Sequence, residues 1–349
     1  DETLDFDPIG SDTVAEKSRF ARRLLQELRW GIDLTRQVRR TRPDVVLVSN
    51  AQIPTLILFS FAMAVLRVPW VLWHQDVYAV AVRSFAGDKL GAGFRLVARA
   101  FEVGERWCAR RAAGIVAIAP SFVPVHEAWG TADKTTVIPN WAPLDEIVPV
   151  DRKNDWAVEN QLDDTLTLLY SGTLGLKHNP ALLVALAGEV RDRGKDVRLV
   201  VVNEGPATEV LRAEAERLEV PLTLLPFQPY DRLPEVLGSG DVLVVLLEQQ
   251  AGAFSVPSKT LSYLCAGRPI LGLMPSENLA AQLIDQVGGY VAAPLEGSVP
   301  EAAHWAADVL GDAERRLVLG EAARDLAERE FALAECTDRF ETILTGCSR

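Results

Sequence analysis

The chain has 349 residues, which is enough for two domains that each bury their own core. With 48% hydrophobic and 24% charged residues and a formal net charge of −12, it is neither a disordered segment nor a good candidate for nucleic-acid binding. The four cysteines lie far apart and neither CxxC nor HExxH occurs. This argues against a zinc site and a disulfide framework and favours a reducing cytosol.

The first predicted helix, Val14–Arg39, is amphipathic and basic. The stretch Lys17–Arg42 holds nine basic residues against Glu27 and Asp33. A basic helix on an acidic protein favours an anionic membrane surface, and the alternative is a solvated helix face. The opening residues DETLDFDPIG show no strand pattern, which suggests a fragment or a chain whose first segment is missing.

Buried strands then alternate with helices. The predicted strands are Val45–Val48, Trp70–Trp73, Gly114–Ala119 and Thr135–Ile138, and predicted helices include Thr55–Leu66 and Lys89–Arg111. This βαβα order predicts a parallel sheet covered on both faces. The longest apolar run, Ile53–Leu66, is too short to span a bilayer, so we expect a buried core helix there.

A polar, charged run, Asp151–Asp164, predicts a linker, after which the alternation restarts. The further predicted strands are Thr165–Tyr170, Val197–Val202, Leu222–Leu225, Asp241–Leu247, Ile270–Met274 and Gly289–Ala293. The further predicted helices are Pro180–Arg193, Ala207–Leu218, Asp231–Leu237, Pro300–Leu310, Ala313–Glu330 and Leu333–Leu344. We therefore expect two doubly wound, Rossmann-like domains, 1–150 and 151–330, with a ligand in the cleft between them. The C-terminal helix in 331–349 is expected to pack back towards the first domain.

The stretch Phe254–Pro269 lies between two predicted buried strands and is the most informative part of the sequence. Pro257 suits the first turn of a helix, and the loop before it would lie at the carboxyl end of a strand, where open α/β sheets bind ligands. Free backbone amides at a helix start attract phosphate, and Lys259 adds a cation. The alternative is an ordinary strand–loop–helix unit with a surface lysine.

Four turns of the second domain would lie at the carboxyl edge of its sheet. They are Gly172–Lys177, Asn203–Pro206, Phe227–Pro229 and Phe254–Lys259. Glycines let backbone amides approach a phosphate closely, and Lys177 and Lys259 are placed to neutralise a diphosphate. Together the turns predict a nucleoside-diphosphate ligand. Neither GxGxxG nor GxxxxGK[ST] occurs, so hydride transfer and ATP hydrolysis have no support.

In the first domain, His74 and Asp76 follow one strand at its carboxyl end. A neutral imidazole can exchange a proton with a sugar hydroxyl near pH 7, and Asp76 can orient that hydroxyl or act as a base. The structural alternatives are a capped core histidine and a helix N-cap. Asn140 and Trp141 fall where the first domain ends, and for Trp141 packing at a hinge is favoured over stacking on a sugar.

Several blocks of the sequence carry a family resemblance. They are His74-Gln75-Asp76, Glu105-Arg106-Trp107, Val137–Trp141, Tyr170–Thr173 with Lys177 and Asn179, Asn203–Pro206, and Val256–Lys259 through Pro269. In this order they resemble the retaining GT-B glycosyltransferases of sequence family 4, in particular the exopolysaccharide and O-antigen branch with its fucosyltransferases. The resemblance covers roughly residues 40–345. It implies the α/β GT-B fold, two Rossmann-like domains facing a cleft, here without a recognisable first βαβ unit.

The resemblance also implies a UDP- or GDP-sugar donor in the second domain and a saccharide acceptor, lipid-linked or soluble, at the first. Donor contacts are expected from Gly172, Thr173, Lys177, Glu204, Gly205, Phe227, Ser255, Val256, Pro257, Ser258, Lys259 and Ser262. Acceptor contacts are expected from His74, Asp76 and Asn140, and catalytic roles from His74, Asp76, Lys177 and Lys259. The sugar would be transferred with retention and without a metal ion or other cofactor, and the departing diphosphate would itself deprotonate the acceptor.

Many members of this family carry two glutamates across the last block, and Phe254 and Ser262 stand at those positions here. Ser262 can hydrogen-bond ribose, whereas Phe254 cannot replace a carboxylate, and Glu248 is a candidate substitute. We therefore expect a cytoplasmic enzyme of bacterial surface-polysaccharide assembly, peripheral at the inner face of the plasma membrane. The alternatives are an enzyme that glycosylates a small soluble acceptor and a non-catalytic partner protein with the same fold.

Overall fold

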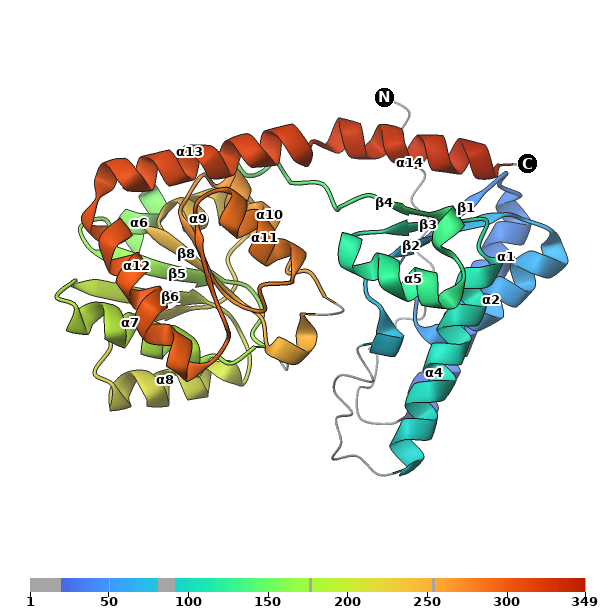
Figure 1. Cartoon of the computed structure of the whole chain (residues 1–349), viewed down its shortest axis with the longest axis horizontal. Helices are drawn as coiled ribbons and strands as arrows, with labels where there is room; N and C mark the ends of the chain where they lie inside the picture. Colours follow the sequence, from blue (N-terminus) through green and yellow to red (C-terminus); the bar gives the residue numbers. More distant parts are fainter. Residues whose placement is uncertain (1–19, 50, 81–91, 176–177, 253–254, 349) are drawn as a thin grey trace. The chain divides into compact units, whose positions relative to one another are not determined.

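The computed structural model of the chain describes residues 20–348, except residues 50, 81–91, 176–177 and 253–254 (Figure 1). The described residues form two compact units. Unit 1 takes the chain up to Pro139 together with the residues from Thr337 onward, and unit 2 takes Asn140–Cys336.

Unit 1 contains a parallel sheet with the strand order β1–β2–β3–β4. The strands are β1 (Val46–Ser49), β2 (Trp70–His74), β3 (Gly114–Ala117) and β4 (Thr135–Val137). The helices are α1 (Phe20–Thr41), α2 (Ile53–Leu66), α4 (Ala92–Arg111), α5 (Val123–Trp129) and most of α14 (Leu333–Cys347). Val71, Ile115 and Val116 in the central strands are fully buried, as expected for a sheet covered on both faces.

Helix α14 packs on unit 1. The ring of Phe340 meets that of Trp73 edge to face at 5.0 Å, and the guanidinium of Arg339 donates to the carbonyl of Val137. At Gly114, an added Cβ would lie 3.1 Å from Sγ of Cys347. The last helix of the chain therefore completes the first unit.

Helix α2 is only partly buried, so the expectation of a buried core helix over Ile53–Leu66 is wrong for one face. Phe59 and Met63 are buried, but 60% of Phe61 and 67% of Val65 are exposed. None of the 14 residues of α2 is charged. A continuous apolar run has no polar side to mark the solvent, so its pattern does not reveal that one face stays open.

Unit 2 contains a parallel sheet with the order β10–β9–β8–β5–β6–β7. The strands are β5 (Leu166–Ser171), β6 (Val197–Val202), β7 (Leu222–Leu225), β8 (Val242–Leu246), β9 (Ile270–Leu273) and β10 (Tyr290–Ala292). The strand order reverses between the neighbours β5 and β8, which pair Leu168 with Val242. At such a switch point, the crevice outside the carboxyl ends of the strands is the usual ligand site.

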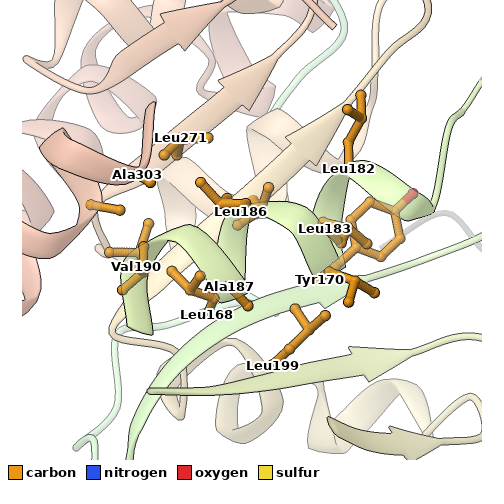
Figure 2. Packing of buried hydrophobic residues seen from close by; sticks show 14 of the residues in the cluster. Leu168, Tyr170, Leu182, Leu183, Leu186, Ala187, Val190, Leu199, Leu271 and Ala303 are labelled. Atoms are coloured by element: carbon orange, nitrogen blue, oxygen red, sulfur yellow. The ribbon is translucent and has the colours of Figure 1, made fainter. Parts of the chain in front are cut away.

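The helices of unit 2 cover both faces of its sheet (Figure 1). They are α6 (Asp155–Glu159), α7 (Ala181–Asp192), α8 (Ala207–Arg217), α9 (Leu233–Gly238), α10 (Lys259–Cys265), α11 (Leu279–Gln286), α12 (Val299–Gly311) and α13 (Ala313–Glu330). Leu183, Leu186 and Val190 of α7 pack over Leu168 and Leu199 of the sheet (Figure 2). Each fully buried leucine contributes about 1.5–3 kcal/mol to folding, so this cluster holds the strand ends in place.

The charged run Asp151–Asp164, expected to be a linker, is built into unit 2. Trp156 is buried and its Nε1 donates to Oε1 of Gln228 at 3.0 Å. Nε of Arg152 donates to Oδ2 of Asp241 at 3.0 Å. The structure instead divides the chain between Pro139 and Asn140.

Two α/β units, each with a parallel sheet, confirm the predicted fold class. Among the described helices, none combines the length and the hydrophobicity needed to cross a bilayer.

Candidate functional site

A cavity of about 610 Å³ opens in unit 2 beside the carboxyl ends of β5 and β8. Its lining includes the turn after β5, the segment before α10 and one side of α9. The lining residues are Asn140, Trp141, Pro143, Ser171, Gly172, Thr173, His178, Leu233, Leu237, Leu247, Ser255, Val256, Pro257, Ser258, Lys259, Leu261, Ser262 and Tyr263. The volume lies within the range of sites for small organic ligands.

Lys259 is the only lysine or arginine among the described lining residues. Its Nζ is buried without a hydrogen-bond partner among the described residues and lies 3.5 Å from the centre of the Tyr170 ring. Burial lowers the pKa of Lys259 to about 7, because an ammonium group loses its hydration there. A cation held in this way attracts an anion that enters the cavity.

Gly172 makes room for this lysine. A Cβ at position 172 would lie 2.9 Å from Nζ of Lys259, and the φ of +133° disfavours any other residue. The amide of Gly172 donates to the carbonyl of Val202 at 3.0 Å. This amide is therefore already hydrogen-bonded, and the predicted contact of Gly172 with the diphosphate stays a prediction.

Two tyrosines brace the turn after β5. The hydroxyl of Tyr263 accepts from the amide of Ser171 at 2.9 Å and donates to its carbonyl at 3.3 Å. The hydroxyl of Tyr170 donates to the carbonyl of Thr173 at 3.0 Å. Burial raises the pKa of both phenols, so they stay neutral and keep these bonds.

The side chain of Asn278 fixes the segment before α10 through two hydrogen bonds to its backbone. Its Nδ2 donates to the carbonyls of Gly252 at 2.9 Å and Ser255 at 2.8 Å, and its Oδ1 accepts from the amide of Ala280 at the start of α11. The amide of Ser255 donates to the carbonyl of Ala251 at 3.2 Å, so it too is occupied. Sequence reasoning missed Asn278, although an asparagine just before a helix is a recognisable N-cap signal.

Helix α10 begins at Lys259, two residues later than Pro257 predicted, and it is short. The amides of Thr260 and Leu261 donate to the carbonyls of Pro257 and Ser258. The side chain of Lys259, rather than the helix start, is thus the cationic feature of this segment.

The structure brings only part of the predicted donor site together. Gly172, Thr173, Ser255, Val256, Pro257, Ser258, Lys259, Ser262 and also Asn140 line the cavity. Glu204, Gly205 and Phe227 do not, and neither does Glu248. Instead Oε1 of Glu204 accepts from the amide of Phe227 at 3.1 Å and ties the ends of β6 and β7 together, with the Phe227 side chain 46% exposed. Lys177 and Phe254 lie outside the described residues.

Sequence reasoning favoured packing for Trp141, but this side chain is 39% exposed and lines the cavity. His178, Leu233 and Leu237 were not singled out, because no local pattern shows that they face the same space.

In unit 1, His74 belongs to a buried network. It is 4% exposed, with Nε2 at 3.1 Å from Oε1 of Glu105 and Nδ1 at 3.2 Å from Nε2 of His126. Nδ1 of His126 lies 3.1 Å from Oγ1 of Thr131, and burial lowers the pKa of His126 to about 3. Both ring nitrogens of His74 lie within hydrogen-bond distance of buried side chains. This favours the interpretation of His74 as a core histidine over a role in acceptor binding.

Glu105 links this network to the loop that carries Asp76. Its carboxylate accepts from the amide of Tyr78 at 3.0 Å and from that of Ala79 at 2.7 Å. Asp76 is half-buried on the same loop, and its predicted contact with an acceptor stays a prediction.

Two α/β units, one with a lysine-bearing cavity at the carboxyl edge of its parallel sheet, are the arrangement expected of GT-B-type proteins. Comparison with known families agrees. A glycosyl transferase 4-like domain model matches residues 10–141, and the model of glycosyl transferases group 1 matches residues 151–326, half of the chain. The chain belongs to the glycosyl transferases group 1 family.

Two curated relatives match part of the chain. WcaI of Escherichia coli, named as a colanic acid biosynthesis glycosyl transferase, is 26% identical over 243 residues, 66% of this chain and 57% of the relative. Alpha-D-kanosaminyltransferase of Streptomyces kanamyceticus is 25% identical over 185 residues, 52% of this chain and 46% of the relative. The chain thus spans about half the length of these relatives.

Solved structures resemble the whole described fold. HepE of Anabaena in complex with UDP and glucose matches with a TM-score of 0.74 at 14% identity, covering 91% of this chain and 81% of that one. WaaG, a glycosyltransferase involved in lipopolysaccharide biosynthesis, matches with a TM-score of 0.67 at 18% identity, covering 97% and 85%. These likenesses confirm the GT-B fold.

Proposed function

We propose that the protein is a glycosyltransferase that moves a sugar from a nucleoside-diphosphate donor to a saccharide acceptor. The observation that carries the proposal is the buried amino group of Lys259, which has no anionic partner among the described residues of the cavity in unit 2. No aspartate or glutamate is among the described residues that line this cavity. A donor diphosphate supplies the missing negative charge.

The other cavity residues suit the rest of such a donor. The hydroxyls of Ser171, Thr173 and Ser258 offer hydrogen bonds, while Trp141 and Leu237 offer apolar and aromatic surface to a sugar or base. The base is proposed to be uracil, in line with the UDP bound by HepE. As the sugar leaves, negative charge grows on the diphosphate, and the Lys259 cation stabilises that charge.

Calorimetric titration with UDP and with GDP tests the donor site. Lys259→Ala is expected to weaken binding by about 1.5–3 kcal/mol, the loss of a charge-assisted hydrogen bond. Lys195→Ala, which changes a lysine of the same unit away from the cavity lining, is the matched control and should bind as the wild type does. If neither nucleotide binds the wild type, the proposed function is wrong.

The finer parts of the proposal rest on the resemblance and on the relatives. We propose transfer with retention to a lipid-linked saccharide in bacterial surface-polysaccharide assembly, supported by the names of WcaI and WaaG. Donor binding is proposed to need no metal ion, because Lys259 provides a cation. UDP affinity should then be equal with EDTA and with Mg²⁺, and a tenfold gain with Mg²⁺ would contradict this part.

We also propose that unit 1 binds an anionic membrane surface. Exposed arginines of α1, among them Arg29 and Arg36, alternate with exposed Leu25 and Ile32 on one stripe of the helix. α1 packs against α2. In this contact the hydroxyl of Thr55 in α2 donates to the carbonyl of Glu27 in α1 at 2.7 Å. α2 adds the exposed apolar face with Phe61 and Val65 described above. Arginines near an anionic surface contribute about 1 kcal/mol each, and an apolar helix face enters the interface.

Flotation with vesicles tests the membrane surface. Binding to vesicles with anionic lipid is expected at low salt, and Phe61→Ser with Val65→Ser should reduce it. Leu317→Ser with Val318→Ser, on exposed apolar residues of α13, is the matched control and should leave it unchanged. Equal binding of the wild type to neutral and anionic vesicles would contradict this part.

The alternative to an enzyme is a non-catalytic protein with the same fold, favoured by Phe254 and Ser262 in place of the glutamate pair. Release of free sugar from the bound donor distinguishes the two. An enzyme hydrolyses its donor slowly without acceptor, whereas a non-catalytic protein binds UDP and leaves the UDP-sugar intact. A small soluble acceptor remains the alternative substrate, and product analysis with lipid-linked and soluble saccharides separates these two.

A further inference from the structure

The ammonium group of Lys259 lies against an aromatic ring at the wall of the cavity. The side chain lines the cavity, yet Nζ itself is buried against the ring of Tyr170 at 3.5 Å from its centre. The face of an aromatic ring is negatively polarised and attracts a cation at this distance. The ring is therefore the one partner of the ammonium among the described residues.

Tyr170 is a fixed platform. It is fully buried at the end of β5, packs beside Leu182 and Leu183 of α7, and its hydroxyl is bound to the carbonyl of Thr173 (Figure 2). Lys259, by contrast, has a long side chain, and its Nζ makes no hydrogen bond to any residue that the structure describes. Of the two side chains, Lys259 therefore has fewer contacts to lose than Tyr170 has.

Among the residues that the structure describes, few titratable groups line the cavity beside Lys259. Tyr170 faces it from β5, and Tyr263 and His178 are the other titratable groups of the described cavity lining. The helix α13 packs against α10, but its Arg324 binds the carbonyl of Cys265, at the opposite end of α10. Burial is accordingly the cause of the lowered pKa of Lys259, about 7.

We propose that Tyr170 holds the Lys259 side chain in a resting position, and that donor binding draws it onto the diphosphate together with one proton taken from solvent. This inference rests on the proposed function. No covalent bond changes except that the neutral amine of Lys259 gains a proton and becomes an ammonium. The free protein is mixed between amine and ammonium near neutral pH, whereas the diphosphate complex keeps the ammonium.

The coupling between donor binding and protonation of Lys259 has two measurable consequences. With a pKa of about 7, most Lys259 side chains of the free protein are amines at pH 8, so binding takes up more than about half a proton. Donor affinity should be highest below pH 7 and should fall up to tenfold per pH unit above it, because a proton must be bound first. The affinity stops falling once the pH exceeds the pKa that Lys259 has in the donor complex.

Calorimetry of UDP binding at pH 8 in two buffers with different ionisation enthalpies measures the proton uptake. At this pH the phosphates of UDP are fully ionised, since their last pKa is about 6, and do not contribute. The wild type is expected to take up more than about half a proton. Lys259→Arg keeps a permanent charge, so it is expected to bind UDP with no uptake and with a flat affinity from pH 7 to 9.

Two variants of Tyr170 isolate the ring. Tyr170→Phe keeps the ring and loses only the bond to Thr173, so its proton uptake should match the wild type. Tyr170→Leu removes the ring and should move the midpoint of the affinity fall down by about 0.5–1.5 pH units. Circular dichroism at each pH checks that both variants are folded.

UDP binding without proton uptake at pH 8, and with an affinity that does not change between pH 7 and 9, would overturn this inference and leave the proposed function intact. Failure of the wild type to bind UDP or GDP at any pH would overturn both. An unchanged midpoint in a folded Tyr170→Leu variant would overturn the role of the ring.

Discussion

At the scale of single residues, the site depends on a glycine, a tyrosine and a lysine that are far apart in the sequence. Gly172 and Tyr170 come from the end of β5, and Lys259 comes from α10. The sequence motifs predicted that Gly172 and Lys259 matter near a phosphate. They did not predict that Gly172, because it lacks a Cβ, leaves the space that Nζ of Lys259 occupies.

Gly172→Ala should therefore damage both stability and donor binding. The added Cβ meets Nζ of Lys259 at 2.9 Å, and the φ of +133° adds backbone strain of about 1–3 kcal/mol. We expect a lower melting temperature and weaker UDP binding by calorimetry. Gly297→Ala, where an added Cβ meets nothing within 4 Å, is the matched control. A Gly172→Ala variant as stable and as tightly binding as the wild type would contradict the packing.

The buried histidine pair of unit 1 predicts a loss of stability in acid. The pKa of His126 is lowered to about 3, first by burial and then by the charge of His74, from a usual value near 6.5. Between pH 3 and pH 6.5, His126 therefore binds a proton in the unfolded chain but not in the folded chain. Stability from this residue is thus fully present above pH 6.5 and falls by up to about 1.4 kcal/mol per pH unit below it.

Urea unfolding at pH 7, 6 and 5 measures this effect. His126→Gln should unfold more easily at pH 7 but lose less stability on acidification than the wild type does. His304→Gln, which changes an exposed histidine, should follow the wild-type pH dependence. Parallel pH dependence of His126→Gln and the wild type would show that another group is responsible.

At the scale of elements, the packing of α13 on the turn Gly267–Pro269 requires a glycine at position 320. An added Cβ at Gly320 would lie 2.2 Å from the carbonyl oxygen of Gly267, so α13 and this turn meet backbone to backbone. Arg324, one turn further along α13, binds the carbonyls of Ile147 and Cys265. The helix therefore clamps the turn that leads into β9.

Gly320→Ala should lower the free energy of unfolding by about 1–3 kcal/mol, because the added methyl group overpacks a rigid backbone contact. Gly311→Ala, at the end of α12, is the matched control. There the added Cβ meets only the flexible end of Lys195, so the change should be neutral or stabilising. Denaturant unfolding of the two variants compares them, and equal stability would contradict the clamp.

α2 shows the same limit of sequence reasoning at this scale. Gly31 of α1 approaches Leu58 and Thr55, and Gly104 of α4 approaches Ile57 and Ile53, so two helices cover α2 in part. Its remaining face, with Phe61, is left open. The sequence predicted the helix correctly, but only its neighbours decide which side is covered.

At the scale of the whole molecule, each unit has its own sheet and core, and all described residues that line the cavity lie within Asn140–Cys336. A polypeptide of these residues is expected to fold and to retain UDP binding that is lost in its own Lys259→Ala variant. Thermal unfolding and calorimetry check this expectation. A folded polypeptide without UDP binding would place essential donor contacts in unit 1.

The sequence by itself determined the alternation of buried strands and helices, the class of fold and the segment around Lys259. Strand and helix patterns and short motifs are local, so they can be recognised without neighbours. Only the tertiary structure decided that Lys259 rests on Tyr170, that Asn278 holds the loop before α10, and that Glu204 and Phe227 stay out of the cavity. These outcomes depend on which groups lose water together, and burial is a property of segments distant in the chain that no local pattern carries.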